Sequence, residues 1–237
     1  MSVEKLRLVT FDLDGTLFAN APYVRKLVAG WFLSHLMRGP LWLFRAVLAA
    51  RAFQKARDEL RTKGLAPGLH ECQFRLAAQR CGYPEPFVRE VVDELIYSNP
   101  FTGADRLVFP GAREALTVLK SRGLLLGVLS DYPVPTKLVA LDLAGVGWDV
   151  LLSAEDVDAL KPHPALFLAA CERVGVAPEA ALHVGDRPDC DVAGARAAGL
   201  RTLLFKGQGP PSHAGPRADY EAASFDGIRL IVESLLR

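Results

Sequence analysis

The chain has 237 residues, half of them apolar, so it is long enough to bury a substantial core. Its formal net charge is +1, which does not indicate a general affinity for nucleic acid or for anionic membranes. Its four cysteines lack the paired spacing of a disulfide frame or a zinc site, which predicts reduced thiols and a cytoplasmic protein.

The first predicted element is a buried strand from Leu6 to Phe11, a short, largely apolar and β-prone run. The N-terminal stretch MSVEKLRLV lacks the basic start and the longer apolar region of a signal peptide. Asp12 and Asp14 follow the strand, and Gly15 then permits a tight turn. Two carboxylates this close repel each other unless a positive group lies beside them, so the sequence predicts such a group.

Residues 22–99 show helical periodicity without the alternation of a strand, which predicts an all-helical insert. Helical segments are expected over residues 24–52 (interrupted at Gly39-Pro40), 57–61, 70–80 and 86–97. We therefore predict two domains, a core of residues 1–18 and 104–237 and a smaller helical domain of residues 19–103.

The most apolar part of this insert runs from Val24 to Ala52. Basic residues and Gly39-Pro40 interrupt it, so it contains no run of about 20 apolar residues and is not expected to span a membrane. We expect two packed amphipathic helices. The alternative is a surface that meets a membrane or another subunit, and a homo-oligomer would form through these apolar helices.

After Pro110-Gly111, helices and strands alternate along the chain. Strands are expected over residues 124–129, 150–153, 181–184 and 200–205, helices over 112–121, 136–143, 164–174, 192–198 and 225–236, and a loop over 207–216. This alternation predicts an α/β fold with a Rossmann-like parallel sheet flanked by helices. Such sheets bind ligands at the carboxyl ends of their strands.

That rule brings distant polar residues to one edge of the sheet. Asp12 and Asp14 follow the first strand, Ser130 follows the second, and Asp186 follows a later one. Lys161 lies before a helix at the same edge.

With Asp191 added, four carboxylates would face one ammonium group. This excess of negative charge predicts a divalent cation, and Mg²⁺ suits a few carboxylates, waters and a substrate phosphate. Zinc is not expected, because no cluster of histidine and cysteine has ligand spacing.

The same edge lacks a Ser-His-Asp arrangement, so a carboxylate is the candidate nucleophile. Asp12 could attack phosphorus and form an aspartyl-phosphate. Asp14 could protonate the leaving oxygen and later deprotonate the attacking water. Ser130 and Lys161 would hold the phosphate oxygens.

Four segments, "FDLDGT", "VLSD", "LKPHP" and "HVGDRPDCDVAGA", resemble the ordered motifs of the haloacid dehalogenase (HAD) superfamily of phosphohydrolases. The resemblance implies that Asp12 is the nucleophile and that Asp14 is the acid/base. It implies that Mg²⁺ is held by Asp12, Asp186 and the backbone carbonyl of Asp14, while Asp191 supports the water shell of the metal. The helical insert is similar to that superfamily's C1 cap, which shapes substrate access.

Several residues depart from the motifs of that superfamily. Asp131 stands where many relatives carry asparagine, His163 where aspartate is commoner, and Arg187 where serine is frequent. The roles of these residues and of Cys190 stay open. Asp191 has an alternative role as the N-cap of the following helix.

The resulting hypothesis is a Mg²⁺-dependent phosphatase that acts on a small phosphorylated metabolite. A phosphomutase and a 2-haloacid dehalogenase are alternatives on the same fold. Dehalogenation releases no alkoxide, so the presence of Asp14 favours phosphate chemistry. A non-catalytic binding protein is the alternative from another class, and it would predict loss of a residue such as Asp12 or Lys161.

Overall fold

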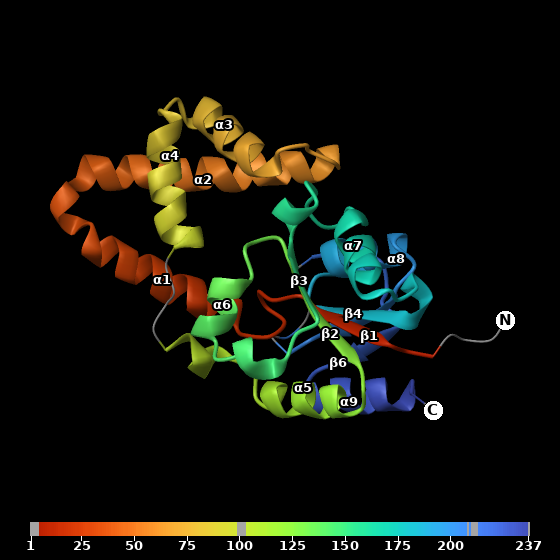
Figure 1. The fold of residues 1–237 in the computed structure, drawn as a ribbon. Coiled ribbons are helices and arrows are strands. Elements are labelled where there is room, and N and C mark those ends of the chain that lie inside the picture. Colours follow the sequence, from red (N-terminus) through yellow and green to blue (C-terminus); the bar gives the residue numbers. More distant parts are fainter. Residues whose placement is uncertain (1–4, 99–102, 208, 210–212, 237) are drawn as a thin grey trace.

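In the computed structural model, which describes residues 5–98, 103–207, 209 and 213–236, six strands form one parallel sheet (Figure 1). The strands are β1 (Leu8–Phe11), β2 (Leu125–Ser130), β3 (Val150–Ser153), β4 (Ala181–Gly185), β5 (Arg201–Phe205) and β6 (Tyr220–Ala222). Their spatial order is β3-β2-β1-β4-β5-β6, and each neighbouring pair is parallel. The predicted α/β fold is therefore confirmed.

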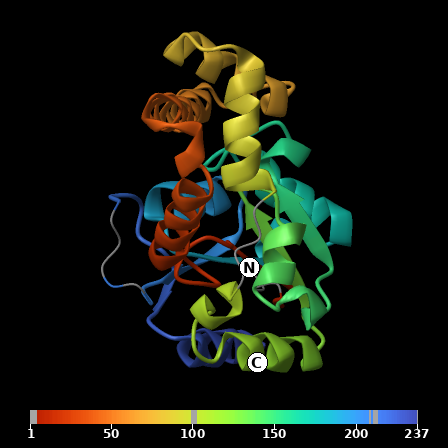
Figure 2. The same cartoon turned by 90° about the vertical axis from the view of Figure 1, so that its left-hand side faces the viewer.

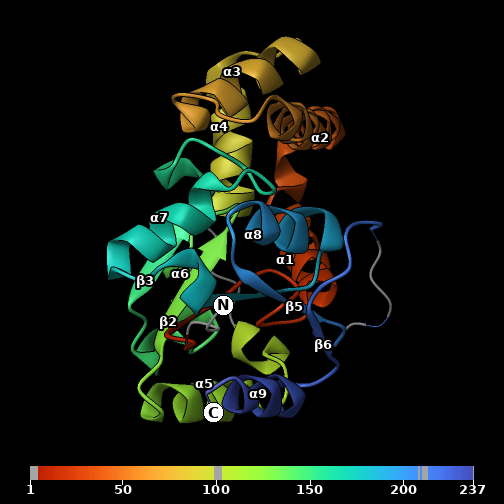
Figure 3. The same cartoon turned by 90° about the vertical axis from the view of Figure 1, so that its right-hand side faces the viewer.

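Helices cover both faces of this sheet. They are α5 (Ala112–Ser121), α6 (Pro135–Ala140), α7 (Ala165–Val174), α8 (Ala193–Ala197) and α9 (Phe225–Ser234). Figure 3 shows α5 and α9 below the sheet and α7 and α8 above it. Because side chains alternate along a strand, Leu8 of β1 joins the core under α7, and Val9 joins the core under α5 and α9.

Four further helices lie beyond the carboxyl ends of the strands (Figures 1 and 2). They are α1 (Asn20–Ser34), α2 (Pro40–Lys63), α3 (Leu69–Cys81) and α4 (Glu85–Val92), and a π-helical turn, η2 (Asp93–Tyr97), follows them. The side chains of Phe53, Phe74 and Val88 join α2, α3 and α4 in a core of their own. We call this group the helical layer; the division of the chain into residues 19–103 and the rest stays a prediction.

The helical layer differs in detail from its predicted segments. Gly39, at a φ of 84°, and Pro40 separate α1 from α2, as the sequence predicts. Helix α2 then runs without a break to Lys63, so the expected separate segment 57–61 belongs to it. No helix of the described residues is long and apolar enough to cross a membrane.

Apolar side chains at the junction of α1 and α2 are exposed, and Met37 is 97% exposed. The predicted homo-oligomer through these helices stays a prediction.

Other element boundaries also depart from the prediction. Strand β6 is absent from it, because three residues at the edge of a sheet carry almost no periodic signal. The expected helix 192–198 is a π-helical turn, η7 (Pro188–Val192), followed by the short α8. Within the expected loop 207–216, residues 208 and 210–212 lie outside the described part of the chain. Residue 99, the end of the expected insert, also lies outside it.

Gly127 lies where β2 closely approaches its neighbouring strands β1 and β3. A Cβ atom at Gly127 would lie 2.5 Å from Val150 Cγ1 and 3.2 Å from Thr10 Cγ2. Gly127→Ala should therefore lower the free energy of unfolding by about 1–3 kcal/mol, measured by urea denaturation.

The control for this substitution is Gly30→Ala in α1, because a Cβ there meets nothing within 4 Å. It should leave stability unchanged or raise it by up to about 1 kcal/mol. Equal effects of the two substitutions would contradict the close approach of β2 to β3.

Candidate active site

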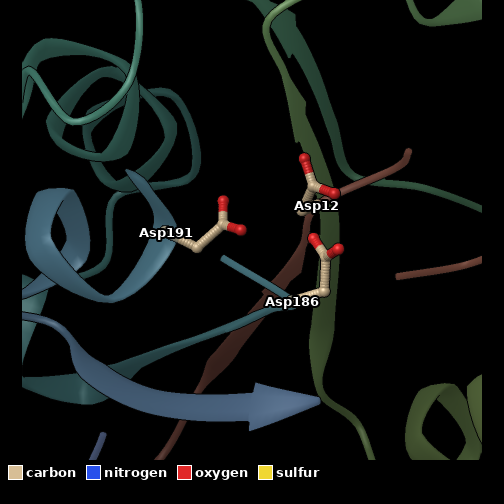
Figure 4. A group of neighbouring side chains, drawn as sticks. All are labelled: Asp12, Asp186 and Asp191. Carbon is tan, nitrogen blue, oxygen red and sulfur yellow. The ribbon is translucent and has the colours of Figure 1, made fainter. Parts of the chain in front are cut away.

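Three of the four predicted aspartates meet at the carboxyl edge of the sheet, and Asp14 does not join them. Asp12 continues β1, and its backbone N–H donates to the carbonyl of Val184 in β4 at 2.8 Å. Asp186 follows β4, and Asp191 lies in η7. One carboxylate oxygen from each of the three aspartates lies within 4.8 Å of the other two (Figure 4).

Lys161 is the positive group that joins this cluster. Its side chain is almost fully buried, and its Nζ lies 2.5 Å from Asp12 Oδ1 and 2.6 Å from Asp191 Oδ1. Burial alone would lower the pKa of Lys161, but the charges of Asp12 and Asp191 outweigh it and raise that pKa well above its ordinary value. Lys161 is therefore held as an ammonium.

One ammonium does not balance the three aspartates. Burial, and then repulsion from Asp191 and the other carboxylates, raises the pKa of Asp12 despite Lys161. Burial and Asp191 likewise raise the pKa of Asp186 to about 7. Within the described residues, the buried Asp186 Oδ1 has no hydrogen-bond partner. An oxygen-rich cluster with excess negative charge and an orphaned carboxylate oxygen fits a hard divalent cation.

Asp191 differs from its two neighbours because both of its oxygens are occupied. Its Oδ1 contacts Lys161 and also His183 Nε2 at 3.3 Å, and its Oδ2 accepts the backbone N–H of Arg187 at 3.0 Å. Burial opposes its ionisation, but Lys161 and His183 prevail and lower its pKa. The alternative of a helix N-cap is wrong, because its side chain accepts from Arg187, before it in the sequence, and caps no helix.

Gly185 makes this position of Asp191 possible. A Cβ atom at residue 185 would overlap the Asp191 carboxylate. The glycine at the end of β4 therefore serves close approach rather than a turn.

The carboxylate of Asp14 lies apart from the cluster and has a different cation. Lys137 of α6 places its Nζ 2.6 Å from Asp14 Oδ1 and 2.8 Å from Oδ2. Ser130 Oγ lies 3.5 Å from Asp14 Oδ2 and accepts the backbone N–H of Tyr132 at 3.1 Å. The structure thus brings Ser130 beside Asp14.

Lys137 is absent from the sequence prediction. A lysine on a short helix is usually solvated, so its residue type carries no signal. Only its place near the start of the helix after β2, at the same sheet edge, could have indicated it.

The Asp131 carboxylate is bonded to the backbone of Lys161 and to the helical layer. Its Oδ1 accepts the backbone N–H of Lys161 at 3.0 Å, and its Oδ2 pairs with Arg61 of α2 at 2.9 Å. Burial would raise the pKa of Asp131, but Arg61 and Lys161 lower it below the ordinary value. Asp131 therefore holds a cation from α2 instead of adding charge beside Asp12.

Arg57, one turn earlier in α2, contacts the same loop. It donates to the backbone carbonyl of Asp131 at 2.6 Å and to Gln73 Oε1 at 2.5 Å, and its guanidinium lies 4.2 Å from the ring centroid of Tyr132. Arg61 also donates to the carbonyl of Lys161. Helix α2 is thus bonded directly to Asp131, which follows Ser130, and to the backbone of Lys161.

The other departures from the motifs have local contacts. His163 Nδ1 accepts the backbone N–H of Ala165 at the start of α7. Arg187 pairs with Asp189 at 2.6 Å. Burial raises the pKa of the Cys190 thiol to about 12, so this thiol is not poised to form a thiolate.

A parallel sheet with carboxylates and a buried lysine at its carboxyl edge defines an α/β protein with one candidate active site. The chain belongs to the haloacid dehalogenase-like hydrolases, because the model of that family matches residues 6–199. The resemblance of the four sequence motifs is thereby confirmed.

The proteins that are similar to this chain include phosphatases and a dehalogenase. The chain is 32% identical over 211 residues to a phosphoglycolate phosphatase of Escherichia coli, covering 84% of this chain and 81% of that protein. A 2-haloacid dehalogenase structure from Pseudomonas syringae is 27% identical, with a TM-score of 0.68 over 97% of this chain and 99% of that one. A HAD phosphatase structure from Thermococcus onnurineus is 25% identical, with a TM-score of 0.60 over 96% and 98%.

The ion pair of Asp131 and Arg61 should make the free energy of unfolding depend on pH. Because the folded-state pKa of Asp131 is lowered, its contribution is present above the unfolded carboxyl pKa of about 4 and is lost as the pH falls through the folded value. Asp131→Asn should therefore lower the free energy of unfolding by about 1–3 kcal/mol at pH 7, with a smaller difference below pH 4.

Denaturant titrations at several pH values measure this difference. Asp226→Asn is the control, because the Asp226 side chain is 69% exposed and pairs with Arg229 on the surface, where about 0.5 kcal/mol or less is expected. A loss for Asp131→Asn that does not change with pH would contradict the electrostatic role.

Proposed function

We propose that this protein hydrolyses phosphate monoesters, with Asp12 as nucleophile and Asp14 as general acid and base. Two observations support the proposal: the similarity to a phosphoglycolate phosphatase and the separate settings of the two carboxylates. Asp12 lies beside Lys161, which is suited to offset charge on a phosphoryl group, and Asp14 lies outside the aspartate cluster beside Lys137.

In the first step, a carboxylate oxygen of Asp12 attacks phosphorus and the bond from phosphorus to the alcohol oxygen breaks. The electron pair of that bond leaves with the alcohol oxygen, which takes the proton of Asp14. In the second step, water attacks the phosphorus of the aspartyl-phosphate and gives its proton to Asp14. The bond from phosphorus to Asp12 then breaks, and inorganic phosphate leaves.

Ser130 and Lys161 are proposed to hold oxygens of the phosphoryl group. Lys161 brings a fixed positive charge from a buried position, so little reorganisation is needed when charge develops. Ser130 Oγ accepts the N–H of Tyr132 and donates its proton to Asp14 over a long 3.5 Å contact, and we propose that this proton turns to a phosphate oxygen when substrate binds.

Mg²⁺ is the proposed cofactor, held by Asp12, Asp186 and the backbone carbonyl of Asp14. The unpaired Asp186 oxygen and the raised pKa values of Asp12 and Asp186 support a cation here. Asp191 would act indirectly, since both of its oxygens already have partners. When bound, the cation offsets negative charge on the phosphoryl oxygens.

We further propose that residues 19–103 act as a cap over a core of residues 1–18 and 104–237. The separate hydrophobic cluster of α2, α3 and α4 supports this division. Closing such a cap would exclude bulk water from the phosphorylated aspartate.

Dehalogenation of a 2-haloacid is the second candidate, because a dehalogenase structure is among the similar ones. In that reaction Asp12 would displace a halide at carbon. The halide leaves as a stable anion and takes no proton. The observation that carries the phosphatase proposal is therefore the position of Asp14, which lies two residues after the nucleophile, outside the aspartate cluster and beside Lys137, where an acid/base group serves only a leaving group that takes a proton.

A substrate panel separates these candidates. Phosphate esters with Mg²⁺ should release inorganic phosphate, and a chelator should abolish the release. Asp12→Asn should lower kcat by at least about 1,000-fold, because no other nucleophile is proposed. A parallel arm supplies 2-chloropropionate and measures chloride. Chloride release without phosphate release would establish the dehalogenase, and undiminished activity of Asp12→Asn would exclude Asp12 as nucleophile.

The role of Asp14 predicts a dependence on the leaving group. Asp14→Asn should slow hydrolysis of alkyl phosphates about 10²- to 10⁴-fold, because the alkoxide needs a proton. With 4-nitrophenyl phosphate, whose leaving group is stable as an anion, the variant should release a rapid burst of nitrophenolate. Slow turnover should follow, because the second step lacks its base.

Stopped-flow absorbance measures this burst, and Asp12→Asn, which should show none, is the control. Equal slowing of both steps for every ester would mean that Asp14 positions the site without transferring a proton.

A further inference from the structure

A cavity of about 680 Å³ extends from the candidate active site into the helical layer. Its walls come from α1, α2, η2 and the end of α4, and from the core residues Asp14, Tyr132 and Lys137. The lining residues of the helical layer are Asn20, Tyr23, Val24, Leu27, Val28, Trp31, Phe32, Ala46, Val47, Ala50, Arg51, Gln54, Lys55, Val92, Leu95 and Ile96. Most of these side chains are apolar.

The polar residues gather at the end of the cavity nearest the sheet. Asp14 and Lys137 form their ion pair there. Tyr132 OH donates a hydrogen bond to Gln54 Oε1 at 3.0 Å, which joins this stretch of α2 to the same end. Lys55 is the neighbour of Gln54, and Arg51 lies one turn before Lys55. The reacting end of the cavity is therefore suited to a charged group.

The opposite end is apolar because of the directions of two helices. Helix α1 begins near the sheet and runs away from it, and α2 runs back toward it (Figure 1). The later turns of α1 and the early turns of α2 thus form the far end, with Val28, Trp31 and Val47 among its residues. Trp31 Nε1 donates to Glu94 at 2.9 Å, so the single polar atom of this indole side chain is already paired.

On the basis of the proposed function, we infer that the substrate is a phosphate monoester whose alcohol carries a large apolar group. The leaving oxygen must lie beside Asp14 to receive its proton, and Asp14 lines the cavity. The alcohol part of the ester therefore enters the cavity. A short polar alcohol would leave the far apolar wall in water, whereas a long apolar one would bury that wall.

This substrate differs from phosphoglycolate, which the name of the Escherichia coli relative gives. The alcohol part of phosphoglycolate is a two-carbon acid, which occupies little of such a cavity and makes no use of its apolar end. Identity of 32% fixes the family and leaves the lining of α1 and α2 free to differ.

A homologous series of substrates tests the inference. Ethyl, butyl, hexyl and octyl phosphate are compared with phosphoglycolate, with Mg²⁺ and below micelle-forming concentrations. From ethyl to hexyl phosphate, kcat/KM should rise by about 3- to 4-fold for each added methylene, because each one leaves water on binding. All alkyl members beyond ethyl should exceed phosphoglycolate.

A pair of variants in α1 locates the effect. Val28→Asp places a charge in the apolar wall and should lower the ratio of kcat/KM for octyl over ethyl phosphate at least about tenfold. Leu33→Asp is the matched control, because Leu33 lies in the same helix, is 70% exposed and is not among the lining residues. It should keep the wild-type ratio. The ratio cancels any general loss of active protein.

The outcomes separate this inference from the proposed function. Hydrolysis of all the esters without a rise along the series, or with phosphoglycolate as the best substrate, would overturn the inference alone. An unchanged ratio in Val28→Asp would do the same. Failure to hydrolyse any ester would overturn the proposed function and the inference with it.

Discussion

The buried ammonium of Lys161 is the group on which the whole site depends. It touches Asp12 and Asp191, which come from β1 and η7, and it stands at the start of the segment leading into α7. Without that charge, the two buried carboxylates would repel each other. The sheet supplies the framework, because the residues that follow parallel strands lie at one edge. The charge of the lysine offsets the repulsion between the carboxylates there.

Much of the site could be predicted because its residues follow strands. Asp12, Ser130 and Asp186 each come directly after an apolar run, and a parallel sheet fixes where such residues go. The residue types of Lys137, Arg57 and Arg61 gave no signal, since a basic residue on a helix is ordinarily solvated. Their partners are Asp14 and the loop after β2, and those pairings depend on how the helices pack.

The fold shows the same division between local and tertiary information. Long periodic segments such as α2 and central strands such as β1 are indicated by their own residues. The three residues of β6 and the π-helical turn η7 are not indicated by their own residues, because each depends on elements that pack against it in space. Asp191 illustrates the point. The sequence allows it to cap a helix, whereas in the structure its carboxylate contacts the side chains of Lys161 and His183 at the carboxyl edge of the sheet.

The bonds that Arg57 and Arg61 make with the loop after β2 join the C-terminal half of α2 directly to the carboxyl edge of the sheet. If these helices swing relative to the sheet while the bonds persist, the C-terminal turns of α2 stay in place and the remote junction at Met37 travels farthest. The end of β2 and the loop bearing Lys161 would then keep their positions.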